Sequence, residues 1–388
     1  MEHLLNPVVK DIEISGIRKI ADKIKNYNDV VSLTIGEPDF KTPDFIKEAG
    51  RQAITDNYTF YAPTAGLYET RVAATEFMKR RYDLNYNPMS EVIVTNGSTE
   101  SIFMALKTML LPGDEVLIPT PAYPGYAPVI DMCYGKLVPI DTTQSDFKLT
   151  KEQLEANLTE KTKVLILTYP SNPTGATMNR EELEELVQVL KDRDIFVISD
   201  ELYSELTFDE EHASIASFSE MRDKTVVING LSKSHAMTGW RIGLMYAPSY
   251  LTEQMLKTHQ YLNTSVNTIA QAAAVTALEK GDEAVRLMRD EYKKRRDLLC
   301  EGLITLGFDI VIPKGTFYAF PSVKPFGVNA MTFTESILKK AKVGLLPSDV
   351  FTEGGENHLR ISFAADEQKI QAALNRLESY VRVGMFLR

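Results

Sequence analysis

Lys233 and Arg241 are the residues whose types and spacing point most directly to covalent chemistry. The β-branched residues 226–228 predict a buried strand, and the chain leaves it through a loop of hydroxyls and glycine that carries Lys233. A lysine that forms a Schiff base needs a lowered pKa, and a second cation such as Arg241 helps to lower it. An arginine that binds a phosphate beside such a lysine is the arrangement of a pyridoxal phosphate (PLP) site, and a basic surface loop is the alternative.

A carboxylate, Asp200, follows the apolar residues 195–199, which predict another buried strand. A carboxylate at the end of such a strand needs a partner that stays cationic, and the protonated nitrogen of a pyridine ring is one such partner. Tyr203 follows three residues later, close enough for its phenol to hydrogen-bond the same ring. A helix cap or a loop hydrogen bond is the alternative role for Asp200.

Two more strand ends carry turn motifs rich in hydrogen-bonding groups. Asn172 lies in the Ser-Asn-Pro-Thr-Gly turn that follows the buried run 163–169. Gly97, Ser98 and Thr99 open a predicted helix, and amides and hydroxyls at a helix N-terminus form a phosphate site, although simple capping uses the same residues. Because ligands of open parallel sheets bind beyond the carboxyl ends of the strands, we expect these motifs to surround one site.

Arg360 places a charge inside the otherwise apolar predicted strand 359–363. Its planar guanidinium suits bidentate binding of a substrate α-carboxylate. A structural ion pair is the alternative.

The composition predicts an ordinary soluble protein and excludes several classes. The 388 residues carry a net charge of −10, which argues against nucleic-acid or anionic-membrane partners. No apolar run is long enough to span a bilayer, and the N-terminus lacks a signal-peptide pattern. Cys133 and Cys300 are the only cysteines, which suits the cytoplasm. The five histidines never fall at metal-ligand spacing, so no metal site is expected.

The elements that must position these residues alternate between strands and helices. Seven strands are predicted at 91–95, 115–119, 136–140, 163–169, 195–199, 225–229 and 241–247. Helices between them, such as 101–110 and 179–191, predict an α/β fold with a mostly parallel sheet covered on both faces. Capping boxes are expected at Asn179 with Glu182 and at Thr150 with Gln153.

A change of rhythm after a long helical region at 267–303 predicts a second, smaller α+β domain. Its predicted strands are 308–312, 316–320 and 359–363, and its predicted helices are 332–342 and 366–381. We therefore expect a large domain at 46–284, and a small domain formed by 1–45 and 285–388.

Taken together, the motifs and their order resemble the class I/II PLP-dependent aminotransferases of fold type I over nearly the whole chain. The resemblance implies a large domain with a mostly parallel seven-stranded sheet. It implies Lys233 as the catalytic Schiff-base lysine, Asp200 on the ring nitrogen, Tyr203 and Asn172 on the ring oxygen, Tyr123 stacked on the ring, and Arg241, Ser232, Gly97, Ser98 and Thr99 on the phosphate. It also implies cis peptide bonds before Pro121 and Pro173.

The resemblance further implies substrate contacts and a homodimer. Gly36 matches the glycine that approaches the α-carboxylate held by Arg360, with Asn172 nearby. Tyr61 resembles the tyrosine that reaches the phosphate of the neighbouring subunit's cofactor, so each site would need two chains. The reaction expected is transfer of an amino group between an L-amino acid and a 2-oxo acid, with 2-oxoglutarate and glutamate as one pair.

The substrate is less well defined by the sequence. Residues 1–7 and 13–19 resemble most closely the subgroup that acts on N-acetyl-LL-diaminopimelate, in bacterial lysine biosynthesis. Aspartate and aromatic amino acids are alternatives. Some acidic-substrate members carry a lysine at the position of the neutral Thr99, which argues against a strict preference for aspartate. Arg18 could approach the site from the N-terminal segment, although an exposed helix arginine is the simpler expectation. A PLP-dependent carbon–sulfur β-lyase uses the same lysine, and a PLP-binding transcription regulator would need a DNA-binding segment that is not visible.

Overall fold

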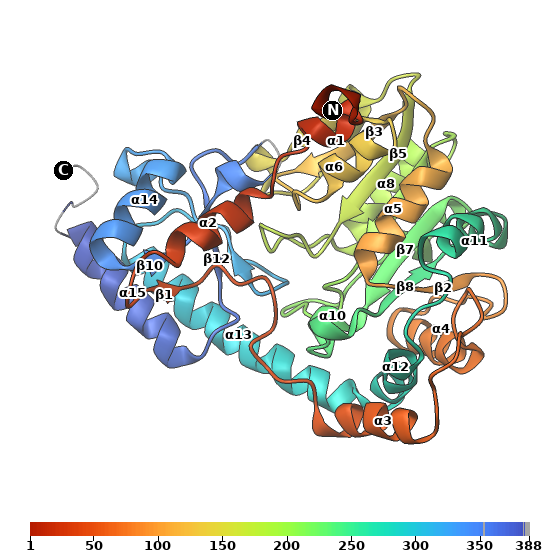
Figure 1. The fold of residues 1–388 in the computed structure, drawn as a ribbon. Helices are drawn as coiled ribbons and strands as arrows, with labels where there is room; N and C mark the ends of the chain where they lie inside the picture. The colour runs from red at the N-terminus through yellow and green to blue at the C-terminus, as the bar shows by residue number, and fades with distance from the viewer. Residues whose placement is uncertain (352–353, 383, 385–388) are drawn as a thin grey trace.

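The computed structural model describes residues 1–351, 354–382 and 384. Its central element is a seven-stranded sheet of order β2-β8-β7-β6-β5-β3-β4 (Figure 1). Only β8 runs antiparallel to its neighbours in this sheet. The strands are β2 (Val92–Thr95), β3 (Glu115–Thr120), β4 (Lys136–Asp141), β5 (Thr162–Thr168), β6 (Phe196–Asp200), β7 (Thr225–Gly230) and β8 (Gly243–Tyr246). The seven strands predicted from the sequence are all confirmed.

Helices cover both faces of this sheet because its strands are apolar on both sides. In β6, for example, Ile198 packs in the core beneath one layer of helices and Val197 in the core beneath the other. One face is covered by α5 (Ser98–Met109), α6 (Tyr126–Met132) and α11 (Ser249–Asn263). The other is covered by α3 (Asp44–Thr55), α4 (Tyr68–Tyr82), α7 (Lys151–Asn157), α8 (Arg180–Leu190) and α12 (Thr268–Lys280).

The helix starts follow the local signals in the sequence. The predicted capping boxes are present: Thr150 with Gln153 begins α7, and Asn179 with Glu182 begins α8. Gly97 precedes α5 with a φ of +78°, which glycine adopts without steric cost. The peptide bonds before Pro121 and Pro173 are cis as expected, as is the bond before Pro170.

The rest of the chain forms a smaller α+β layer beside the sheet. Its strands are β1 (Val31–Ser32), which pairs with β10 (Val343–Gly344), and the antiparallel set β11 (Leu346–Pro347), β12 (Leu359–Ser362) and β9 (Tyr318–Ala319). Helices α13 (Asp282–Thr305), α14 (Ala330–Ala341) and α15 (Glu367–Arg382) pack against them. Figure 1 shows α13 running from the side of α12 into this smaller layer.

One predicted strand, 308–312, is wrong. In this run only Asp309 makes a bridge, to Ser322. Phe308 is buried, and it packs edge-to-face against Phe326 and Phe333. The apolar alternation therefore reflects side-chain packing without a ladder of backbone hydrogen bonds, since tertiary contacts override a short strand pattern.

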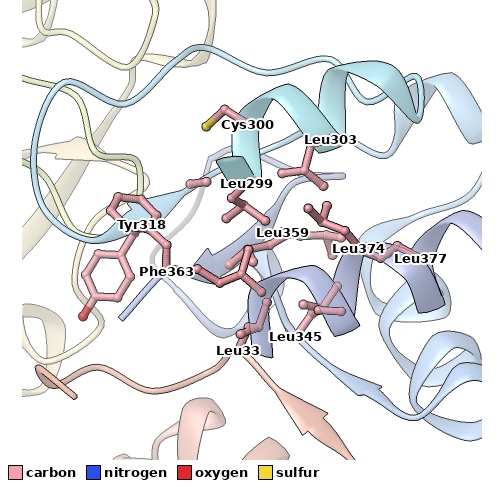
Figure 2. Close-up of a cluster of buried hydrophobic side chains, with 14 of the residues drawn as sticks. Leu33, Leu299, Cys300, Leu303, Tyr318, Leu345, Leu359, Phe363, Leu374 and Leu377 are labelled. Carbon is pink, nitrogen blue, oxygen red and sulfur yellow. The ribbon is translucent and has the colours of Figure 1, made fainter. Parts of the chain in front are cut away.

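The N-terminal segment crosses from one layer to the other. Helix α1 (Pro7–Asp11) contacts α6 beside the large sheet, and Ile20 of α2 (Gly16–Ile24) packs with Leu346 and Phe351 of the smaller layer (Figure 1). Figure 2 shows Leu33, just after β1, among the leucines of α13, α15 and β12. The domain division at 46–284 against 1–45 and 285–388 stays a prediction; residues 352–353, 383 and 385–388 of that range lie outside the described residues.

Candidate active site

A cavity of about 350 Å³ lies at the carboxyl ends of β5, β6 and β7, and residues from the smaller layer close its other side. Eleven residues expected at the site line it: Gly36, Ser98, Thr99, Tyr123, Asn172, Asp200, Tyr203, Ser232, Lys233, Arg241 and Arg360. Gly97 lies directly behind this wall, next to Arg241. Motifs far apart in the sequence therefore meet at one place, as expected for an open parallel sheet.

Lys233 enters this cavity from α10 (Leu231–Ser234), the single turn that follows β7. Its Nζ donates a hydrogen bond of 2.6 Å to the carbonyl oxygen of Gly36, which belongs to the N-terminal segment. The side chain is mostly enclosed, and its ammonium lies 5.9 Å from the centre of the Tyr203 ring. Within the described residues Lys233 is thus held by a hydrogen bond to a backbone carbonyl and not by an ion pair.

Burial lowers the pKa of Lys233 from 10.5 to about 8, because the interior disfavours the charged form. The Arg360 guanidinium lowers this pKa further, and Arg241 has a smaller effect in the same direction. Glu37 and Asp200 oppose the change. The sequence had indicated Arg241 as the nearby cation, but Arg360, 127 positions away in sequence, has the larger effect on the lysine.

Asp200 ends β6 and is buried in the cavity wall. Its Oδ2 accepts a hydrogen bond of 2.7 Å from the Tyr126 hydroxyl, and its Oδ1 accepts a longer one of 3.3 Å from the Leu202 amide. Burial raises the pKa of Asp200, and these two hydrogen bonds oppose that change. A buried carboxylate supported in this way favours a cationic partner in the cavity, such as a protonated ring nitrogen.

Two close backbone approaches, at Gly97 and Gly243, shape a pocket at the start of α5. A Cβ on Gly97 would lie 2.3 Å from Nη2 of Arg241, so only glycine lets the guanidinium lie against this turn. A Cβ on Gly243 would lie 2.8 Å from the Ser98 nitrogen. Arg241 donates to the Thr238 carbonyl at 3.0 Å and makes no ion pair within the described residues. The guanidinium beside a helix N-terminus is suited to an anion such as a phosphate.

Arg360 is buried on β12 and has spare hydrogen-bonding capacity. It donates to Oδ1 of Asn172 at 2.9 Å and to the Thr34 carbonyl at 3.0 Å, while its Nε has no partner among the described atoms. Its guanidinium lies 4.2 Å from the centre of the Tyr318 ring. The structural ion pair that the sequence left open is not formed within the described residues. A buried guanidinium without a counter-ion is suited to a carboxylate ligand.

The aromatic residues form a connected wall. Tyr203 and Tyr318 share a hydrogen bond of 3.0 Å between their hydroxyls, and Tyr123 packs edge-to-face on Tyr126 with ring centres 5.5 Å apart. Figure 2 shows the Tyr318 ring at the edge of the leucine cluster, with its hydroxyl directed away from the leucines. A Cβ on Gly36 would lie 3.3 Å from that hydroxyl, so Gly36 brings the N-terminal segment close to the cavity.

Tyr61 is the one expected residue that lies away from this cavity. It is 87% exposed and borders a shallow hollow formed by residues 58–61 and 265–269. Within its own chain it therefore contacts none of the groups described above. Its proposed role depends on a second chain.

Sequence reasoning missed seven residues that line the cavity: Ile17, Ile102, Tyr126, Thr168, Leu202, Thr238 and Tyr318. Tyr126 begins α6 three residues after Tyr123, so a second aromatic so close in sequence was a signal that could have been used. Tyr318 reads as an ordinary strand residue, and nothing in its sequence context marks the hydroxyl. Arg18 is exposed on α2, as the simpler expectation had it, and its neighbour Ile17 faces the cavity.

In the described part of the chain no three His, Cys, Asp or Glu side chains come together as metal ligands. None of its helices is both long enough and apolar enough to cross a membrane.

The sequence and the fold were compared with those of known proteins. A family model described as aminotransferase class I and II matches residues 28–377. The chain is 48% identical to a probable N-acetyl-LL-diaminopimelate aminotransferase of Bacillus subtilis, covering 98% of this chain and 96% of the relative. It is 41% identical to an aspartate aminotransferase of Pyrococcus abyssi, covering 95% and 96%. The solved structure of an aromatic aminotransferase from Pyrococcus horikoshii has a TM-score of 0.89 at 39% identity, covering 94% of this chain and 99% of that one.

The family match, these relatives and the arrangement of the cavity lead to one conclusion. The chain belongs to the class I and II aminotransferases, which are PLP-dependent enzymes of fold type I that transfer amino groups between small molecules.

Proposed function

We propose that the cavity binds PLP through Lys233 and uses it to move an amino group from an L-amino acid to a 2-oxo acid. Three features of the cavity fit this cofactor: an enclosed lysine of lowered pKa, a buried carboxylate and a guanidinium at a helix N-terminus. A fourth, a buried guanidinium without a counter-ion among the described residues, fits the substrate carboxylate. The observation that carries the proposal is Lys233 in one cavity with both Asp200 and Arg241.

In this proposal, different predicted residues bind different parts of the cofactor. Asp200 pairs with the ring nitrogen, Tyr203 and Asn172 hydrogen-bond the ring oxygen, and Tyr123 stacks on the ring. The phosphate is held by Arg241, Ser232 and the backbone of Gly97, Ser98 and Thr99. Each of these residues lines the cavity or lies directly behind its wall.

Bound PLP supplies an aldehyde carbon for a Schiff base and a protonated ring that withdraws electrons from the substrate α-carbon. Lys233 has a pKa of about 8, so part of its population is neutral near pH 7 and can accept a proton at Nζ. The same nitrogen returns the proton on the other side of the transfer, because its ammonium form is the acid. Asp200 stays ionised throughout, so that its negative charge stabilises the protonated ring.

Arg360 orients the substrate. Its two hydrogen bonds, to Asn172 and to the Thr34 carbonyl, fix the guanidinium plane, and the guanidinium lines the cavity without a counter-ion among the described residues, so it suits an incoming α-carboxylate. Gly36 allows that carboxylate to approach the backbone, because no Cβ occupies the space beside Tyr318 and Arg360.

A direct test is reduction with borohydride after incubation with PLP, followed by mass mapping of the peptides. We expect the adduct on Lys233, and its absence would refute the assignment. Lys233→Ala should abolish transamination while the circular dichroism spectrum stays the same. Substantial residual turnover without added amine would count against the proposal.

The amino donor we propose is N-acetyl-LL-diaminopimelate, with 2-oxoglutarate as the acceptor. The name of the Bacillus subtilis relative supports this choice, and aspartate and aromatic amino acids are alternatives because the other relatives carry those names. A panel of these donors with 2-oxoglutarate, compared by kcat/KM, separates the three. Release of pyruvate and thiol from cystathionine without amino transfer would instead favour a β-lyase.

The active unit we propose is a homodimer in which Tyr61 contacts the partner's cofactor phosphate. Exposed aromatic side chains support an interface here: Phe60 and Tyr61 lie at 80% and 87% exposure beside the hollow, and large exposed patches of this kind mark interaction sites. Mixed dimers test it, because Lys233→Ala and Tyr61→Ala chains should each be weak alone and regain activity when mixed. No regain in a mixture shown to contain dimers by sedimentation would refute the shared site.

The compartment we propose is the cytoplasm. Cys133 and Cys300 are both free and buried, which suits a reducing environment. Cell fractionation with an antibody against the chain would test this assignment.

A further inference from the structure

Tyr126 has no assigned role, yet it makes the shortest hydrogen bond to Asp200. It is the first residue of α6 and is almost completely buried, with its ring edge-to-face on Tyr123. Its hydroxyl lies 2.7 Å from Oδ2 of Asp200, whereas the Leu202 amide lies 3.3 Å from Oδ1. Within the described residues no lysine, arginine or histidine forms an ion pair with Asp200. The phenol is therefore the main hydrogen-bond donor to this carboxylate.

The direction of this hydrogen bond follows from the surroundings. Burial raises the pKa of Tyr126 well above its usual range, so the phenol keeps its proton and donates it. The Thr168 side chain hydrogen-bonds the Tyr126 oxygen. Thr168 is the last residue of β5, and it pairs with Asp200 in the parallel register of β5 and β6. Two hydroxyls from different elements thus form a chain that ends on the carboxylate.

The charged groups that face Asp200 do not supply the same support. Glu201, the next residue, disfavours its ionised form, and Lys233 favours it only weakly. The nearby Tyr203 and Tyr123 hydroxyls also belong to phenols whose pKa burial raises. A hydrogen bond donated to the ionised form is therefore needed to keep this buried carboxylate charged.

We propose that Tyr126 is a positioning residue that holds Asp200 ionised and oriented toward the ring nitrogen of PLP. This inference rests on the proposed function. The phenyl ring of Tyr126 would remain in place in Tyr126→Phe, so this change removes the hydroxyl alone. Hydrogen bonds to charged groups are the stronger class, so we expect a roughly tenfold loss of PLP affinity and a roughly tenfold fall in kcat. The KM for the amino donor should change little, because Arg360 is untouched.

The experiment measures PLP affinity by absorbance titration of the cofactor-free protein, together with kcat and KM. Tyr246→Phe is the matched control: Tyr246 is also fully buried, and its hydroxyl donates to the Ala74 carbonyl at 3.3 Å, in the core formed with α4 and α12. We expect the control to keep wild-type affinity and kcat. If Tyr126→Phe matches the control in both, the inference is overturned.

The two proposals fail in distinguishable ways. A borohydride-trapped adduct on Lys233 in both wild type and Tyr126→Phe, with equal PLP affinities, overturns the positioning role and leaves the proposed function intact. No adduct in the wild type overturns both. If Tyr126→Phe does not fold, Thr168→Val removes the donor to Tyr126 instead, and a smaller loss of affinity in the same direction supports the inference. An unchanged affinity in Thr168→Val then overturns it.

Discussion

Replacing Lys233 by methionine measures how much a buried amine in this cavity lowers the free energy of unfolding. The fall in pKa from 10.5 to about 8 corresponds to about 3 kcal/mol of free energy that disfavours the ammonium in the folded state. At pH values between these two pKa values the unfolded chain binds more protons than the folded one, so the free energy of unfolding rises with pH. Methionine keeps a similar length and does not titrate. Lys233→Met should therefore be more stable than the wild type at pH 7. This difference in the free energy of unfolding should become smaller as the pH rises.

The magnitude follows from the same two values. Between pH 7 and pH 9 the wild type should gain about 1 kcal/mol relative to Lys233→Met, since the folded lysine loses most of its proton in that window. The assay is urea unfolding of the PLP-free proteins at both pH values and at one protein concentration. Lys79→Met, at an exposed position on α4, controls for the loss of a surface charge. A stability difference that is the same at pH 7 and pH 9 would refute the lowered pKa.

Two further predictions concern Arg360 and Gly175. Arg360→Gln should lower kcat/KM roughly 100-fold for every amino donor, because charge-assisted hydrogen bonds of about 1.5–3 kcal/mol are lost, and a loss limited to one donor would argue for a side-chain role instead. Gly175 has a φ of +74°, and a Cβ there would lie 2.3 Å from Cβ of Pro313. Gly175→Ala should therefore lower the free energy of unfolding by about 2–4 kcal/mol. Gly113, with φ +90° and open space around it, is the matched control: Gly113→Ala should cost only about 1 kcal/mol, and equal losses would show that the contact is unimportant.

Most of the fold was predictable because its signals are local. Runs such as 163–169 and 195–199 are apolar over the length of a strand, and the intervening amphipathic segments begin with capping residues such as Asn179. The failure at 308–312 has a tertiary cause. Its alternation is real, but Phe308 packs against Phe326 and Phe333, and pairing in this run is limited to the bridge at Asp309.

The candidate site was predictable to the extent that its residues belong to motifs. Lys233, Asp200 and Asn172 each follow a strand, so the rule for parallel sheets brings them together before any coordinates are known. Arg360 was found because a charge interrupts an apolar strand. Tyr318 was missed, since its hydroxyl reaches Tyr203 only through the packing of the smaller layer on the sheet.

The sequence by itself determined the seven strands, the order of the motifs and the family they resemble, because each depends on neighbouring residues and on one general rule of sheet topology. Only the tertiary structure decided which cation lowers the pKa of Lys233 most and which phenol holds Asp200. Those contacts join residues 127 and 74 positions apart, and they depend on how the helices and the smaller layer pack against the ends of the strands. Electrostatic effects in a buried site follow distance and burial, which no local pattern encodes.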